Sequence, residues 1–274
     1  MKTAIIIEKV TDSLLKIIET EQELPWIKGW DNFQLPRNGM TKFAYNGVNL
    51  YLSFLPYAVQ EYYTFKQIKQ MGHRIKDNEK GNVIAYWSMI PSKTVDEETG
   101  KPKLFPLLKY YYVWNVEQTT IPMPEIKECT SLREGEDILN GYKGKPEVQY
   151  GGDRAYYSPS SDKVVVPPGF SFKESEEFYS TLFHELVHST GHEKRLKRDM
   201  SGMFGDEMYS KEELIAELGS AFLCGIAGMK SRGRVRNHAA YLKGWMSKLK
   251  EDKKMFFDAM SKASKAINYI VGEI

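Results

Sequence analysis

The chain has 274 residues, of which 42% are hydrophobic, so it is long enough to bury the core of one large domain or of two ordinary ones. Its 38 basic and 36 acidic side chains leave a formal net charge of only +2, which excludes an inhibitor that imitates DNA, because such a protein would be strongly acidic. No apolar run reaches the roughly 18 residues of a membrane span, and the start of the chain lacks a signal-peptide cleavage site. The two cysteines have no metal-binding spacing, so we expect a cytoplasmic protein with reduced thiols and no membrane partner.

Helical patterns begin near the start of the chain. Residues 11–23 have an apolar stripe of helical period, with Asp12 in the position of an N-cap. A second helix is predicted to open at Thr64, because Gln67 three residues later completes a capping box. Between them, residues 48–55 form a short apolar run that fits a buried strand or a helix, and periodicity does not decide between the two.

Strand patterns follow in the remainder of the first half. Residues 83–87 and 107–116 are rich in aromatic and β-branched side chains, which predicts two strands. The polar residues 91–103 between them predict a hairpin tip or loop. Helices and aromatic strands in this order indicate a small α+β domain, which we place at residues 1–120.

The proline-containing residues 121–128 are expected to link this domain to a second one at residues 129–274. In the second half, a strand, a turn and another strand are predicted around residues 151–167, followed by a group of helices. The predicted helices cover residues 131–142, 178–191, 210–222, 236–250 and 252–271. A β-hairpin followed by helices is typical of a minimal zincin, the fold of many zinc peptidases, so the whole chain is assigned to the α+β class.

The strongest functional signal is the pattern H-E-x-x-H at His184, Glu185 and His188. It lies in an apolar stripe of helical period that ends near Gly191. Two histidines four residues apart share one face of a helix and can bind one divalent ion. Glu185 between them is placed to take a proton from a metal-activated water, as in zinc peptidases. The alternative is a surface helix with two unrelated histidines.

A catalytic zinc ion needs a third protein ligand. His192 follows His184 by eight residues. One class of zinc peptidases has its third histidine ten residues after the first, and that position here is Lys194. We therefore expect the third ligand on the next helix, at Glu217, which lies among small side chains that allow close approach. This is a gluzincin-like arrangement, and the alternative for Glu217 is a solvated helix face. One turn earlier, Glu213 is interpreted mainly as the partner of Ser210 in a capping box that opens this helix.

Supporting roles around the metal are expected from four residues. His192 is either a partner of a metal ligand or a residue that caps the end of the helix. Glu213 shares a helix face with Glu217 and is a candidate partner of the ligands as well as a cap. Tyr156 or Tyr157, on the strand before the metal helix, is a candidate to stabilise the oxyanion of a reacting peptide.

Together these motifs resemble the ArdC-type antirestriction proteins of conjugative plasmids and mobile elements, and the resemblance covers nearly the whole chain. It rests on residues 25–30, 38–49, 64–72, 76–81 and 110–118 in the first half, and on residues 152–167, 183–196 and 213–217 in the second. The sequence departs from the family pattern at Lys42, where the family usually has a glycine, and in an unusual insertion near residues 91–103.

The resemblance implies an N-terminal domain that binds single-stranded DNA, a C-terminal zincin-like metallopeptidase domain similar to the SprT and Spartan group, and protection of incoming plasmid DNA from restriction. Single strands bind by stacking on aromatic side chains beside basic ones. The residues of suitable type in the first half are Trp26, Lys28, Trp30, Arg37, Asn38, Tyr45, Lys66 and Lys69. Without the resemblance, such aromatics would be assigned to the core and such lysines to a solvated surface. The basic residues 230–238 could border the same path or form a charged loop between helices.

Three functions follow as expectations. The first is a peptidase that uses Zn²⁺, or Mn²⁺ or another divalent ion, to cut a protein held near single-stranded DNA; the sequence identifies neither that protein nor an oligomeric state. The second is a non-catalytic protein that coats single strands and blocks restriction enzymes sterically, with a structural metal site. The third, a metal-dependent nuclease or small-molecule hydrolase, is disfavoured, because nucleases usually use two metal ions and clustered carboxylates.

Overall fold

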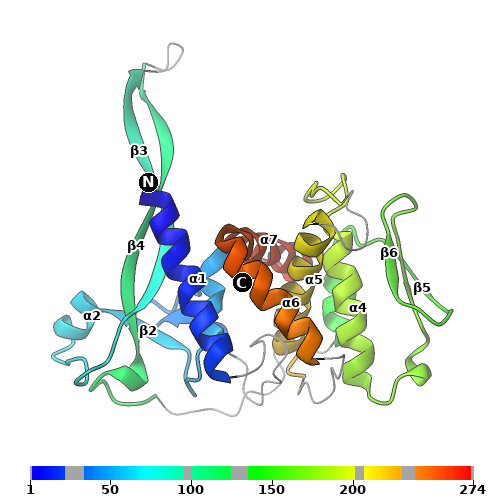
Figure 1. Cartoon of the computed structure of the whole chain (residues 1–274), viewed down its shortest axis with the longest axis horizontal. Helices are drawn as coiled ribbons and strands as arrows, with labels where there is room; N and C mark the ends of the chain where they lie inside the picture. The colour runs from blue at the N-terminus through cyan, green and yellow to red at the C-terminus, as the bar shows by residue number, and fades with distance from the viewer. Residues whose placement is uncertain are drawn as a thin grey trace.

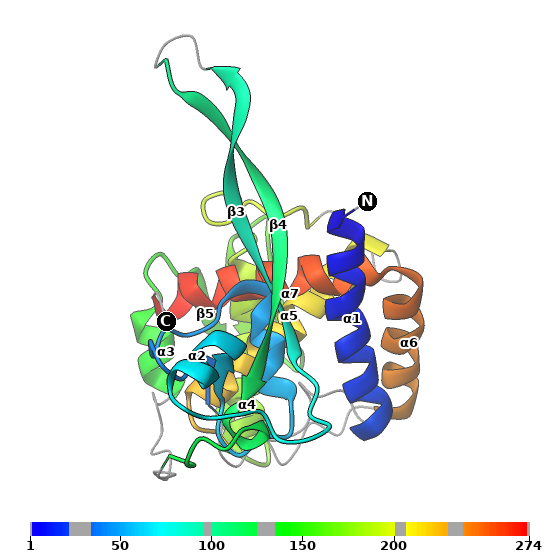
Figure 2. The ribbon, with the colours of Figure 1, turned by 90° about the vertical axis from the view of Figure 1, so that its left-hand side faces the viewer.

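A long two-stranded arm and a group of helices dominate the structure, a computed structural model that describes residues 2–21, 34–95, 100–124, 135–200, 207–229 and 238–272 (Figures 1 and 2). The α-helices are α1 (Lys2–Glu21), α2 (Phe65–Gln70), α3 (Gly135–Gly141), α4 (Ser175–Ser189), α5 (Glu207–Ile226), α6 (His238–Glu251) and α7 (Lys253–Val271). Short 3-10 helices are η1 (Gly47–Phe54), η2 (Val116–Gln118) and η3 (Gly169–Ser171). The chain combines these helices with two separate sheets, each of which contains an antiparallel pair, which confirms the α+β class.

The first sheet has the strand order β1-β2-β4-β3. Its strands are β1 (Arg37–Asn38), β2 (Glu61–Thr64), β3 (Asn82–Val95) and β4 (Pro102–Asn115). Strands β3 and β4 pair antiparallel from Asn82 opposite Val113 out to Val95 opposite Pro102, and the outer part of this hairpin projects as an arm beyond the rest of the chain (Figure 1). Residues 91–95 and 102–103, predicted as part of a hairpin tip or loop, are therefore strand. Polar residues are compatible with a strand whose two faces are both exposed, so polarity alone was a poor guide there.

One helix assignment in the first half needs correction, and one undecided segment is resolved. Helix α1 begins at Lys2 instead of residue 11, so Asp12 lies inside the helix and does not cap it. The apolar stripe starts earlier than predicted, because Ile6 and Val10 are buried together with Leu14. The undecided segment at residues 48–55 is the 3-10 helix η1. The helix predicted to open at Thr64 is α2, and the capping box with Gln67 is present.

The second sheet has the order β5-β7-β6 and supports the H-E-x-x-H helix. Its strands are β5 (Glu147–Tyr150), β6 (Tyr156–Ser158) and β7 (Lys163–Val166). The β6–β7 pair is the predicted strand, turn and strand, while β5 adds a parallel strand on the other side of β7. Helix α4 packs on β6 and β7 with one side and on α5 with another, so it is buried along most of its length.

Helix α7 connects the two halves of the chain. It contacts α5 from the second half and both η1 and α1 from the first half. The core is accordingly continuous, and the rings of Phe54 and Phe222 lie 5.4 Å apart across it. The division into residues 1–120, 121–128 and 129–274 stays a prediction. Among the described residues, no helix combines the length and the apolar composition needed to cross a membrane.

The close packing of α4 on α5 depends on a glycine. A Cβ atom added to Gly219 of α5 would lie 2.8 and 2.9 Å from the two Cγ atoms of Val187 in α4, closer than real Cβ contacts allow. Val187 is fully buried and β-branched, so its side chain has little room to move. Gly219 therefore sets the distance between the two helices.

We predict that Gly219→Ala destabilises the protein by about 1–3 kcal/mol, because the steric conflict outweighs the gain in helix propensity. Gly244→Ala in α6 is a matched control, since nothing lies within 4 Å of a Cβ at that position. It should stabilise the protein by up to about 1 kcal/mol. Urea unfolding of both variants measures the two effects, and a Gly219→Ala protein at least as stable as wild type would contradict the packing argument.

Candidate metal centre

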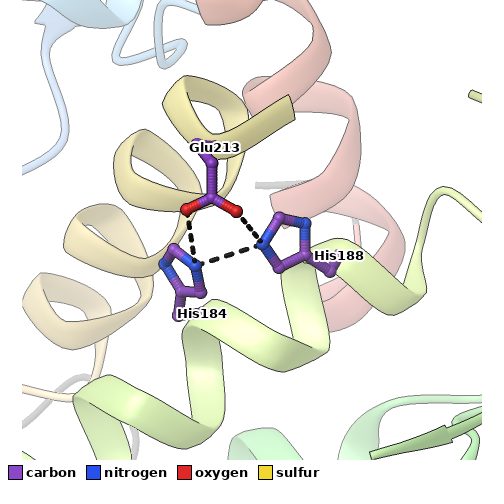
Figure 3. A group of neighbouring side chains, drawn as sticks. All are labelled: His184, His188 and Glu213. Atoms are coloured by element: carbon purple, nitrogen blue, oxygen red, sulfur yellow. Dashed lines mark hydrogen bonds and ion pairs between the residues drawn. The ribbon is translucent and has the colours of Figure 1, made fainter. Parts of the chain in front are cut away.

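His184 and His188 stand one turn apart on α4 and face Glu213 of α5 (Figure 3). Their Nε2 atoms are 3.1 Å apart. Glu213 Oε2 lies 3.5 Å from Nε2 of His184, and Oε1 lies 3.4 Å from Nε2 of His188. Two ligand atoms bound about 2.05 Å from a tetrahedral zinc ion would be roughly 3.3 Å apart. The three groups therefore have the spacing that one small divalent ion requires.

The other ring nitrogens of the two histidines face two further carboxylates. Glu212 Oε1 lies 3.2 Å from Nδ1 of His188, within hydrogen-bond distance. Glu217 Oε1 lies 3.7 Å from Nδ1 of His184, which is an ion-pair distance and too long for a hydrogen bond; that buried Nδ1 has no hydrogen-bond partner. Histidines that bind metals commonly give their second N–H to a carboxylate, which directs the other nitrogen at the ion. The arrangement thus fits a metal on the Nε2 side of both rings.

The carboxylate that lies at the two Nε2 atoms is that of Glu213, whereas the sequence indicated Glu217 as the third ligand. Glu217 is on the Nδ1 side of His184. The interpretation of Glu213 as a capping residue is wrong, because α5 begins at Glu207 and Ser210 lies inside the helix. The two glutamates are one turn apart on the same face, so the pattern in the sequence allowed either to reach the histidines. The way α5 crosses α4 brings the earlier one to the Nε2 atoms.

Burial and charge adapt this site to a cation. His184, Glu185 and His188 are between 8 and 9% exposed. Burial alone would lower the pKa of His188, but hydrogen bonds to Glu212 and Glu213 outweigh it, and the pKa rises to about 10. Burial likewise opposes the charge of Glu213, yet both histidines hold its pKa well below the usual range. The negative charge of Glu185 also contributes to the raised pKa of His188. Without an ion, this cluster therefore retains a proton as its compensating cation.

Two of the supporting candidates lie around a different group, and the third is exposed. The Tyr157 hydroxyl donates to Asp162 at 2.9 Å and accepts a hydrogen bond from Arg195 at 3.2 Å. His192 accepts a hydrogen bond from the backbone of Lys194 at 3.2 Å, and its Nδ1 is 3.9 Å from an oxygen of Asp162. Tyr156 is 51% exposed on β6. The contacts of Tyr157 and His192 centre on the Asp162–Arg195 ion pair and not on the two metal-facing histidines.

The residues predicted to contact DNA divide into three groups. Lys66 and Lys69 are exposed on α2. Arg37 pairs with the buried carboxylate of Glu61 at 2.7 Å, Asn38 exchanges hydrogen bonds with Gln67, and Tyr45 is half-buried, which raises its pKa to about 12. Trp26, Lys28, Trp30 and residues 230–237 lie outside the described part of the chain.

Lys42, which stands where the family usually has a glycine, adopts a backbone conformation that favours glycine. Its φ angle is 64°, the left-handed conformation that favours glycine. The lysine side chain forms an ion pair with Glu61 at 2.9 Å, beside the pair that Arg37 makes with the same carboxylate. Burial raises the pKa of Glu61, but the hydrogen bonds and charges of these two basic residues reverse this, and the net pKa is lowered. The ion pair therefore offsets some of the backbone strain.

Family models match both halves of the chain. Residues 4–114 match the model described as the N-terminal domain of anti-restriction factor ArdC, and residues 137–262 match one described as a zincin-like metallopeptidase. Two crystal structures of the antirestriction ArdC protein from plasmid R388 are similar over 96% of this chain and 96% of theirs. The metal-free structure has a TM-score of 0.75 at 31% identity, and the Mn(II)-bound structure has 0.73 at 29%.

Curated relatives extend the comparison to chains of different length. The uncharacterized protein y4eC of Sinorhizobium fredii (strain NBRC 101917 / NGR234) is 29% identical over 97% of this chain and 91% of its own length. Two proteins of Escherichia coli named DNA primase TraC are 33% and 31% identical over 96% and 97% of this chain. The chain spans only 27% and 20% of those two proteins.

The raised pKa of His188 predicts how stability depends on pH. The folded, metal-free protein holds this proton up to a pKa of about 10, against 6.5 for an ordinary histidine. Between these two pKa values, the folded state binds more protons than the unfolded state, so the free energy of unfolding falls as the pH rises from 6.5 to about 10. We expect the Tm of chelator-treated protein to fall between about pH 7 and pH 9.

Protein saturated with Zn²⁺ or Mn²⁺ should not show this part of the fall, because an imidazole bound through Nε2 has already lost the proton in the folded state. The comparison of the two pH profiles isolates the site from other titrating groups. Parallel profiles with and without the chelator would contradict the assignment, as would a His188→Gln variant that keeps the difference.

Proposed function

The chain belongs to the ArdC-type antirestriction family, and from this membership we propose that it is a zinc-dependent peptidase that binds single-stranded DNA in the cytoplasm and cuts a protein nearby. The observation that carries the peptidase proposal is the convergence of His184, His188 and Glu213 at 3.1 to 3.5 Å, next in sequence to the buried Glu185. A surface helix with unrelated histidines would need none of this burial or convergence.

Each residue has a distinct part in the proposed reaction. Nε2 of His184, Nε2 of His188 and the carboxylate of Glu213 would hold the ion, which supplies Lewis acidity to the scissile carbonyl and to water. Glu185 accepts a proton from the attacking water as the water oxygen bonds to the carbonyl carbon. It then gives this proton to the departing amine as the C–N bond breaks. Glu212 keeps the imidazole of His188 oriented through a hydrogen bond at Nδ1, whereas Glu217 lies at ion-pair distance from Nδ1 of His184.

Zinc and manganese are both compatible with these donors. Two imidazoles and one carboxylate are typical of catalytic zinc sites, and imidazole with carboxylate also suits Mn²⁺. The Mn(II)-bound structure of the R388 protein shows that a relative accepts a divalent ion. We propose Zn²⁺ as the ion that supports peptide hydrolysis and Mn²⁺ as a ligand of the same three side chains.

Single-strand binding is proposed for the first half, and the β3–β4 arm supports it. Trp87 is 58% exposed, Phe105 45% and Tyr86 42%, although large aromatic side chains are usually buried. Within the described residues 82–95 and 100–115 there are lysines and no carboxylates; the acidic residues 96–98 lie outside the described part. By the pairing register, Tyr86 and Phe105 share one face of the hairpin and Trp87 lies on the other. Exposed aromatic rings beside lysines are groups on which bases stack and phosphates bind. Lys66 and Lys69 on α2 would extend this path.

Glu185→Gln is expected to abolish hydrolysis of casein or of the protein itself, with a loss of at least about 10²-fold, because the base is removed. Binding of Zn²⁺ should persist, since the three ligands are retained. Glu176→Gln, in the first turn of the same helix, is the matched control and should keep full activity. Equal activity in Glu185→Gln and wild type would remove Glu185 from the mechanism.

The same variant separates the peptidase from a steric coat. If Glu185→Gln protects transferred DNA from restriction as well as wild type does, the antirestriction activity is that of a non-catalytic DNA-binding protein. Loss of protection, with DNA binding intact, supports the peptidase. DNA that stays intact on long incubation with Zn²⁺ or Mn²⁺ would also count against a nuclease.

Replacing Trp87 and Phe105 with serine should weaken binding of a single-stranded oligonucleotide by about 1–3 kcal/mol per lost stacking contact. Phe170→Ser is the control, because Phe170 is 91% exposed in η3 of the other half. Fluorescence anisotropy at several salt concentrations measures the affinities and the phosphate contribution. Wild-type affinity in the Trp87 and Phe105 variants would exclude the arm as the binding surface.

A further inference from the structure

Arg198 lies in the segment after α4, and its guanidinium is almost fully buried, with 5% of the side chain exposed. It donates hydrogen bonds to the carbonyl of Val187 at 2.8 Å and to the hydroxyl of Thr190 at 2.6 Å. Val187 lies in the last turn of α4 and Thr190 is its C-cap, so both acceptors belong to the C-terminal end of the helix. Arg198 therefore fixes the end of the helix that carries both histidines.

The same guanidinium holds Glu212 of α5 in a two-pronged ion pair. Nε donates to Oε2 at 3.0 Å, and a terminal nitrogen donates to Oε1 at 2.6 Å. Oε1 is also the atom that lies 3.2 Å from Nδ1 of His188. Because both carboxylate oxygens are engaged by one planar group, the carboxylate has a single orientation toward the imidazole. A continuous set of contacts thus runs from Arg198 through Glu212 to His188.

We propose that Arg198 is a positioning residue for the metal centre, which acts on His188 through Glu212. This inference rests on the metal site proposed above. Arg198 directs Nε2 of His188 at the ion by fixing the carboxylate behind the ring. It also provides a positive charge beside Glu212, in a centre where Glu185, Glu212, Glu213 and Glu217 lie close to two histidines.

An arginine suits this position better than a lysine. The Arg198 guanidinium contacts Glu212, Val187 and Thr190 at once, through donors that point in three directions. A lysine ammonium has one nitrogen and cannot engage both carboxylate oxygens and the helix end with the same geometry. Lysine should therefore retain the charge but lose part of the orientation, which separates the two contributions.

The test is the affinity of the purified full chain for Zn²⁺ and Mn²⁺, measured by competition with a chromogenic chelator. Arg198→Gln should weaken metal binding by about 10–100-fold, the usual effect of losing an outer partner of a metal ligand. Arg198→Lys should fall between this variant and wild type. The visible absorption spectrum of the Co²⁺-loaded protein should change in Arg198→Gln, because the orientation of one ligand changes.

Arg195→Gln is the matched control. Arg195 lies in the same segment, is 4% exposed, and also joins a carboxylate, Asp162, to a backbone carbonyl at the end of α4, that of Ser189. Its contacts do not lead to His184 or His188. A general loosening of the segment would affect both variants equally, whereas the proposal requires metal affinity and the Co²⁺ spectrum to change only in the Arg198 variant.

Arg198→Gln alone leaves the buried charge of Glu212 unpaired and could misfold for that reason. The variant Glu212→Gln removes this charge and provides a second background for the test. In that background, adding Arg198→Gln should cause little further loss of metal affinity, since the two residues act as a unit. Independent losses that add, unchanged affinity in a folded Arg198→Gln protein, or an equal loss in Arg195→Gln would overturn the proposal. Wild-type protein that binds neither ion would overturn the proposed metal site and this inference with it.

Discussion

Two imidazole nitrogens and one carboxylate meet in a buried place between α4 and α5, and this convergence is the constraint on which the rest of the site depends. Nε2 atoms 3.1 Å apart, with a carboxylate 3.4 to 3.5 Å from each, are favourable only when a cation or a proton lies among them. In the metal-free protein, the raised pKa of His188 reflects the same need for a positive charge between these groups. A divalent ion would satisfy it with the ligand number that a catalytic site uses.

The surrounding fold holds these three groups in place by packing and by charge. Gly219 lets α5 approach α4 closely at Val187, and Ser220 donates a hydrogen bond to the carbonyl of Ser180 at 2.9 Å. The sheet β5-β7-β6 covers another side of α4. Helix α7 then joins α5 to η1 and α1, so the metal centre and the part of the chain with the exposed arm share one core. Such continuity would give the proposed DNA-binding arm and the metal centre a common rigid support.

Sequence reasoning identified the parts of the site that depend on local periodicity. His184 and His188 are four residues apart, and a helix necessarily puts them on one face. The choice between Glu213 and Glu217 depends on how two helices cross, which a repeat of about 3.6 residues cannot reveal. Glu212 and Arg198 were missed for a related reason, since their contacts with the histidine helix come from tertiary packing. The available signal was a largely apolar segment of α5 that contains Glu212, Glu213 and Glu217, and it indicated the helix without showing which glutamate reaches the histidines.

The same limits apply to the fold. The α+β class, α2 with its capping box and the β6–β7 hairpin follow from local patterns, whereas the length of the arm depends on pairing between β3 and β4. The most direct test of the account is a crystal structure of the protein soaked in Zn²⁺ or Mn²⁺, with anomalous scattering at the metal edge. The account predicts one anomalous peak bound by Nε2 of His184, Nε2 of His188 and the carboxylate of Glu213. A peak bound by Glu217 in place of Glu213, or no peak at saturating metal, would contradict it.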